Sequence, residues 1–134
     1  MDPPPSSPAI LHRERTFGAE AAAACGAGIA WVRQALDDWH FSDRGGDVVL
    51  AAAELLSNAA EHAGGVLRLS LVHHCGLMHI AVTDPSPDPP RLGAHRSDSL
   101  GGHGLFIIDR LALTWGTRPE DSGKTVWADL PFPP

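Results

Sequence analysis

Two pairs of strand-like segments, each joined by a turn, constrain the fold of this chain more than any other feature. Residues 66–72 form a strand-like segment by alternation and β-branching, and residues 78–83 return as a second strand after one short turn. Residues 113–118 and 124–130 form a closing hairpin around another turn. Strands joined by such short turns must run in opposite directions. With a further strand expected at residues 10–17, the sequence predicts a largely antiparallel sheet.

Three segments carry apolar residues at helical spacing. The first is alanine-rich and covers residues 19–36; the second is expected to be capped by Ser42 or Asp43 and to end at Gly64–Gly65; the third covers residues 102–113. The expected order is β-α-α-β-β-loop-α-β-β. Because the helices must bury their apolar stripes on one face of the sheet, we expect an α/β (α+β) two-layer sandwich with a mixed, mostly antiparallel sheet.

Length and composition narrow the domain organisation and the class of partner. The 134 residues suffice for one domain with a core, which we expect at residues 9–131 after a disordered, Pro/Ser-rich tail at residues 1–8. The formal net charge of −6 argues against a basic face for nucleic acid. Two distant cysteines favour a reducing compartment. Since no membrane-spanning or signal segment is recognisable, we expect a cytoplasmic protein without direct membrane or nucleic-acid contact.

Three short motifs, taken in order, point to one chemistry. Glu54 and Asn58 lie four residues apart on a predicted helix and therefore share one face. Asp84 follows the apolar strand at residues 78–83. A glycine cluster at residues 101–104 opens the last predicted helix, where backbone N–H groups and the helix dipole attract anions. Together these motifs predict a pocket for a nucleotide with Mg²⁺.

Each residue type suits one part of such a ligand. The side-chain oxygen of Asn58 can bind Mg²⁺ without adding negative charge beside phosphates, and Glu54 can act as general base. A buried Asp84 needs a donor, which the exocyclic amine of adenine would supply. Thr125 can hydrogen-bond a base or a water. Taken singly, each motif also has an ordinary structural interpretation: a solvated helix face, an Asp-Pro turn, a loop-to-helix junction and a β-branched strand residue.

As a set, these motifs resemble those of the GHKL ATP-binding superfamily, which includes DNA gyrase, Hsp90, histidine kinases and mismatch-repair ATPases. Glu54-x-x-x-Asn58 resembles the N box, Asp84 the first G box, and Gly102-His-Gly104-Leu105 the second G box. The resemblance covers about residues 10–130 and is strongest to the small anti-sigma-factor serine kinases and their stand-alone relatives. It implies a Bergerat-type ATP-binding fold.

The resemblance also implies roles for the motif residues and a set of partners. Asn58 would bind Mg²⁺ and Glu54 would be the general base. The residues implied in binding ATP are Asn58, Asp84, Gly102, Gly104, Leu105 and Thr125, with residues 88–101 as a mobile lid. The implied activity is phosphorylation of a serine on an anti-anti-sigma partner, together with binding of a sigma factor. Homodimers would form through residues 10–36.

One departure from the family pattern keeps two functions open. The first G box is usually Asp-x-Gly-x-Gly, whereas Asp84 is followed here by Pro85-Ser86-Pro87. Proline removes an N–H and stiffens the turn. Retained Glu54 favours a serine/threonine protein kinase. The altered G box favours a non-catalytic or weakly ATP-binding module that regulates transcription by sequestering partners. The catalytic half of a histidine kinase is a weaker third reading, because the chain has no room for a dimerisation hairpin.

Overall fold

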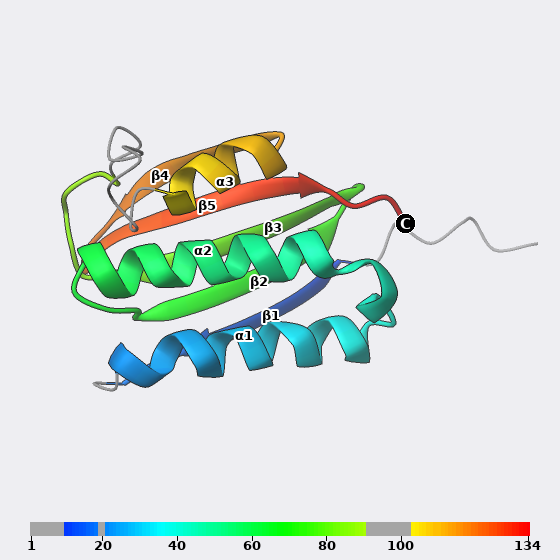
Figure 1. Ribbon diagram of the computed structural model, residues 1–134, viewed down its shortest axis with the longest axis horizontal. Helices are drawn as coiled ribbons and strands as arrows, with labels where there is room; N and C mark the ends of the chain where they lie inside the picture. The colour runs from blue at the N-terminus through cyan, green and yellow to red at the C-terminus, as the bar shows by residue number, and fades with distance from the viewer. Residues whose placement is uncertain (1–9, 19–20, 91–102) are drawn as a thin grey trace, which may run out of the picture.

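The computed structural model describes residues 10–18, 21–90 and 103–134; of residues 21–23 and 103–105 it describes the backbone alone. The elements in chain order are β1 (Leu11–Thr16), α1 (Ala21–Asp38), the 3₁₀ turn η1 (Ser42–Arg44), α2 (Gly46–His62), β2 (Arg68–His74), β3 (Leu77–Asp84), α3 (His103–Leu111), β4 (Thr114–Glu120) and β5 (Gly123–Pro131) (Figure 1). Apart from η1, this is the predicted order of elements.

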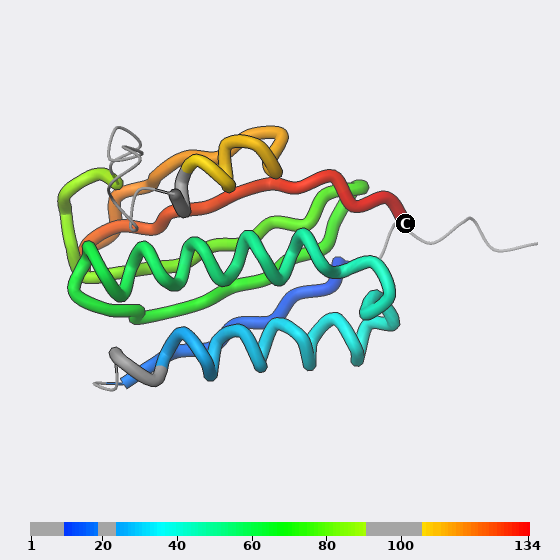
Figure 2. Tube along the Cα trace, viewed as in Figure 1, coloured from blue at the N-terminus to red at the C-terminus, as the bar shows by residue number. Residues whose placement is uncertain are grey.

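The five strands form one sheet in the order β1-β2-β3-β5-β4, and every strand pair is antiparallel. Helices α1, α2 and α3 lie on one face of this sheet (Figure 1). The predicted two-layer α+β sandwich with a mostly antiparallel sheet is therefore confirmed. Its topology brings the end of β3 and the start of β5 side by side at the end of the molecule where α2 finishes (Figure 2).

The core lies between α2 and the middle of the sheet. Helix α2 buries one apolar stripe, namely Val48, Ala51, Ala52, Leu55, Leu56 and Ala59, against inward-facing residues of β2, β3 and β5. Small residues on α1 permit close packing, because a Cβ at Gly28 would lie 2.7 Å from Leu56 Cδ1. This packing fixes α2 on the sheet and with it the position of the side chains on its C-terminal half.

The start of α2 differs from the prediction. Ser42 and Asp43 lie in η1, and α2 begins at Gly46 after Gly45, without a side-chain cap. The Ser42 hydroxyl contacts Asp37 Oδ1 instead, at 3.1 Å. The reason is tertiary: Gly45 is buried, and a Cβ there would lie 2.6 Å from Leu36 Cδ1, so the chain must approach α1 closely before the helix can begin.

Two chain reversals follow the sequence signals more closely. Helix α2 ends before Gly64, which has φ +84°, and the N–H of Gly65 donates to Ala59 O at 3.1 Å, as expected for a glycine helix stop. The turn expected within residues 73–77 narrows to Cys75 and Gly76, both with positive φ, which is the conformation that tight hairpins favour. For this reason β2 ends two residues later and β3 begins one residue earlier than predicted.

Both cysteines are free: Cys25 is half-buried and Cys75 is exposed at the β2–β3 turn. Within the described part of the chain, no helix combines the length and the apolar character needed to cross a membrane.

Candidate functional site

Helix α2 carries the first pair of predicted site residues. Glu54 and Asn58 lie one turn apart in its C-terminal half; Glu54 is half-buried and Asn58 is only 7% exposed. The Asn58 side chain forms no hydrogen bond with the residues that the structure describes. It lies among the buried residues of α2 that pack on the sheet, and its amide retains its capacity to bind a ligand.

Asp84 ends β3 and is completely buried, with 0% of its surface exposed. One carboxylate oxygen, Oδ1, accepts hydrogen bonds from Lys124 Nζ at 3.0 Å and from the Ser86 N–H at 2.9 Å. The other oxygen, Oδ2, is buried and has no partner among the described residues. A buried polar atom without a partner is unusual and costly, and such atoms often mark a binding site.

The protonation of Asp84 reflects opposing influences. Burial raises the pKa of the carboxyl above its usual value, whereas the hydrogen bond from Lys124, the Ser86 N–H and the charge of Lys124 act in the lowering direction. Burial is the largest of these influences. A carboxyl whose pKa is perturbed by burial beside one specific charge partner is typical of functional sites as well as of buried ion pairs.

The segment after Asp84 is held by its own side chains. The Ser86 N–H donates to Asp84 Oδ1, and the Asp88 N–H donates to Ser86 Oγ at 3.2 Å. Lys124 Nζ also reaches the Ser86 carbonyl oxygen at 3.4 Å. The N–H that matters for Asp84 is therefore retained despite the prolines on either side. The Pro85-Ser86-Pro87 segment is thus a hydrogen-bonded turn around the carboxylate.

Thr125 lies on the other face of the sheet from Asp84. In the β3–β5 register Thr83 pairs with Thr125 and Asp84 pairs with Lys124, and neighbouring side chains on a strand point to opposite faces. Thr125 Oγ1 is 2.6 Å from Thr83 Oγ1 and donates to Glu120 Oε1 at 2.7 Å. Thr125 therefore does not adjoin Asp84, and its support of adenine stays a prediction.

A charged cluster covers the two threonines on that outer face. Glu120 Oε1 lies 3.6 Å from Arg68 Nη2 and 3.7 Å from Arg118 Nε, and Arg68 Nε lies 3.3 Å from Glu14 Oε1. The Thr125 hydrogen bond, followed by Arg68 and Arg118, lowers the pKa of the Glu120 carboxyl. These contacts link β1, β2, β4 and β5, which gives Thr125 a structural role in the sheet.

Lys124 is the site residue that the sequence motifs missed. It is the only lysine of the chain and is 5% exposed, on the core-facing side of β5 with Val126, Ala128 and Leu130. One sequence signal could have found it. Lys124 is spaced by two residues from the apolar positions of the last strand, which places its side chain on the core-facing side. Its partner could not be read from the sequence, because the register between β3 and β5 is a non-local property.

The glycine motif is described only in part. Gly104 and Leu105 lie in the first turn of α3, which packs along α2. The N-terminal end of α3 faces the same end of the molecule as the end of β3 (Figure 1). Gly102 and residues 91–101 of the predicted lid lie outside the described residues. The described elements thus gather the N-box helix, Asp84 and the start of α3 around one end of the sheet.

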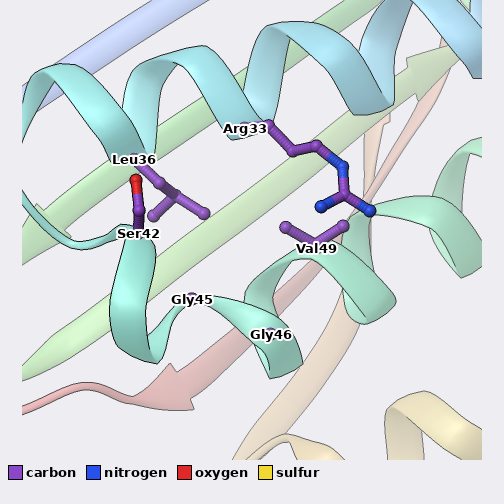
Figure 3. A pocket seen from close by; sticks show the side chains of 6 residues that line it. All are labelled: Arg33, Leu36, Ser42, Gly45, Gly46 and Val49. Carbon is purple, nitrogen blue, oxygen red and sulfur yellow. The ribbon is translucent and has the colours of Figure 1, made fainter.

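A separate cavity of about 240 Å³ lies at the other end of α2, lined by Arg33, Leu36, Ser42, Gly45, Gly46 and Val49 (Figure 3). It is formed by α1, η1 and the first turns of α2, and none of the predicted site residues lines it. The candidate site is therefore the Asp84 end of the molecule and not this cavity.

Comparison with known proteins identifies one family. The profile of a family described as "Histidine kinase-like ATPase domain" matches residues 41–130, which include α2, Asp84 and β5 and leave out β1 and α1. No curated protein matches the chain significantly.

Proposed function

This chain belongs to the histidine kinase-like ATPase domain family, and from that membership we propose that it is an ATP-dependent serine/threonine kinase of the anti-sigma-factor type. Domains of this family bind ATP, usually with Mg²⁺. The coarser function, an ATP-binding regulatory domain, follows from the family. The phosphorylation of an anti-anti-sigma partner is the finer step that we propose.

The observation that carries the proposal is the unpartnered oxygen of Asp84. Oδ2 is buried at the end of β3 and lacks a donor among the described residues. The exocyclic amine of adenine is such a donor, whereas guanine has a carbonyl acceptor at the same ring position. The residues present therefore fit an adenine nucleotide, because binding would satisfy an atom that otherwise lowers the stability of the fold.

The remaining residues divide the other tasks of the site. Asn58 would hold Mg²⁺ through its amide oxygen, and the backbone around Gly102, Gly104 and Leu105 would bind phosphate oxygens. Bound ATP would supply the phosphoryl group that is transferred. Glu54 would accept the proton of the attacking serine hydroxyl, since it lies one helical turn from Asn58. Thr125 would act through the sheet that carries Asp84 and Lys124 and not through direct contact.

The proposed partners are proteins. A formal net charge of −6 favours regulation of transcription through a held sigma factor over direct binding of DNA, which requires a basic face. The phosphoacceptor would be a serine of an anti-anti-sigma protein, and self-association would use residues 10–36. These partners imply a cytoplasmic protein.

A non-catalytic function is the second candidate. Pro85 and Pro87 stand in the glycine-rich part of the first G box, and the turn is fixed by the hydrogen bonds of Ser86. If nucleotide binding needs this turn to move, the protein would bind ATP weakly and regulate by partner sequestration alone. Retention of Glu54 favours the kinase instead.

Two measurements in sequence test the proposal. Calorimetric titration of the folded protein with Mg-ATP should give a binding isotherm, and absence of heat at millimolar nucleotide would reject ATP binding. Transfer of labelled γ-phosphate from ATP to a serine of an anti-anti-sigma partner should then be detected. A protein that binds ATP and holds its partner without any transfer supports the second candidate and rejects the kinase.

A further inference from the structure

Lys124 places a buried ammonium group on the core-facing side of the sheet. Its side chain is 6% exposed, and its Nζ contacts Asp84 Oδ1 at 3.0 Å and the Ser86 carbonyl oxygen at 3.4 Å. Burying an ammonium group is costly, and a buried ion pair is seldom more stabilising than apolar residues of the same size. The pair therefore calls for an explanation other than stability.

The contacts of Asp84 are distributed unequally between its two oxygens. Lys124 and the Ser86 N–H both donate to Oδ1, and neither reaches Oδ2. Two donors on one oxygen fix the rotation of the carboxylate about the Cβ–Cγ bond of Asp84. As a result Oδ2 is left as a buried acceptor of fixed direction, while Oδ1 is saturated.

We propose that Lys124 is a positioning residue that selects the purine base: it holds Asp84 as an ionised, oriented acceptor whose Oδ2 receives the exocyclic amine of adenine. The inference rests on the proposed ATP binding. It deepens that function, because it says what keeps the site specific for adenine. A protonated Asp84 could donate to the carbonyl of guanine, so discrimination requires that the carboxyl stay ionised.

The surroundings of Asp84 make Lys124 the group on which ionisation depends. Among the described residues, Lys124 is the one charged side chain in contact with this carboxyl, and the Ser86 N–H is its other donor. Burial raises the pKa of Asp84, and Lys124 opposes this through its hydrogen bond and its charge. Removal of Lys124 leaves burial opposed by a single backbone N–H.

The first experiment needs no nucleotide. The ¹³C resonance of the Asp84 carboxyl is followed against pH in the parent, in Lys124→Met and in Arg118→Met, which removes an exposed arginine of β4 as a charge control. We expect the midpoint to rise in Lys124→Met by about one pH unit or more, and to remain unchanged in Arg118→Met. An equal midpoint in the parent and in Lys124→Met overturns the role of Lys124.

The second experiment measures base selection. The ratio of the GTP and ATP dissociation constants is determined between about pH 6 and pH 9 by calorimetry. The parent should favour ATP with a ratio that varies little, whereas Lys124→Met should lose about tenfold of this preference at the acid end and recover part of it at the alkaline end. Asp84→Asn should lose the preference at every pH. A Lys124→Met ratio equal to that of the parent at all pH values overturns the inference.

A third measurement uses the unmutated protein and does not depend on the folding of a variant. Because Lys124 is the only lysine, protein labelled with [ε-¹³C]lysine gives one side-chain signal. We expect ATP to shift this signal and GTP at the same concentration to leave it in place. An unchanged signal at saturating ATP overturns the inference. If the parent does not bind ATP at all, both the proposed function and the selection of the purine base are rejected. The titration of Asp84 decides separately whether Lys124 controls the ionisation of that carboxyl.

Discussion

Asn58 is a buried amide in the middle of an apolar helix stripe. Its side-chain nitrogen and oxygen keep access to solvent, because Asp84 Oδ2 is the one buried side-chain nitrogen or oxygen without a partner among the described residues. The described residues offer it no side-chain partner. An amide that lies among apolar residues and makes no hydrogen bond with the described residues is free to bind a ligand, and the proposed ligand is Mg²⁺, which its oxygen suits.

We therefore expect Asn58→Ala to weaken Mg-ATP binding about tenfold or more, with a smaller loss when Mg²⁺ is removed by a chelator. The thermal unfolding temperature should change little, since the variant loses a buried polar group and little volume. Ser57→Ala is the matched control: Ser57 lies one residue earlier and its hydroxyl contacts Glu61 Oε1 at 3.2 Å. Calorimetry in which both variants bind like the parent would contradict the assignment.

Glu54 should affect chemistry more than binding. Glu54→Gln keeps the size of the side chain and removes its basicity, so the affinity for Mg-ATP should be retained while phosphotransfer to the partner falls about 10²–10⁴-fold. The two quantities are measured on the same preparation by calorimetry and by transfer of labelled phosphate. Full transfer by Glu54→Gln would exclude this carboxylate as the general base.

At the scale of elements, the sequence predicts what is periodic and misses what depends on long-range contact. Apolar strand-like segments separated by turns identified the strands, and the glycine stop identified the end of α2. The start of α2 was predicted wrongly, because Gly45 packs against Leu36 of another helix. The same limit applies to the candidate site. Motifs predict Glu54, Asn58 and Asp84, but they could not show that Thr125 and Lys124, one residue apart on β5, lie on opposite faces of the sheet.

Gly123 is the element-scale feature that holds Asp84 and Lys124 together. It begins β5 directly after the turn from β4, and a Cβ there would clash with the backbone of Asp84 and lie 2.8 Å from Pro85 Cα. Backbone atoms cannot move aside as a flexible side chain can. The close approach of the two strands at this point therefore requires glycine.

We expect Gly123→Ala to lower the free energy of unfolding by about 2–4 kcal/mol and to weaken ATP binding, because relief of the clash must move Asp84 or Pro85. Gly46→Ala is the control: Gly46 is exposed in the first turn of α2, with nothing within 4 Å of the added Cβ, and its stability should equal or exceed that of the parent. Denaturant unfolding gives both values. A Gly123→Ala variant as stable as Gly46→Ala would contradict the close-approach argument.

The two edges of the sheet differ. The strand order leaves β1 at one edge of the sheet and β4 at the other. The family match begins at residue 41, so β1 and α1 lie outside the matched domain. In the sheet, β2 and β3 separate β1 from β5, which carries Lys124. Self-association through β1 and α1 would thus leave the Asp84 end accessible to nucleotide.

The two edges also provide a matched test of that self-association. Ile10 precedes β1 and is 61% exposed, and Leu113 precedes β4 and is 67% exposed. If residues 10–36 form the homodimer interface, burial of Ile10 there would contribute about 1.5–3 kcal/mol, and Ile10→Lys should raise the dimer dissociation constant about tenfold or more. Leu113→Lys should leave it unchanged. Light scattering over protein concentrations on the order of 1–100 μM follows the transition. A parent that stays monomeric throughout this range, or a Leu113→Lys variant that dissociates as readily as Ile10→Lys, would show that the N-terminal strand and helix are not the interface.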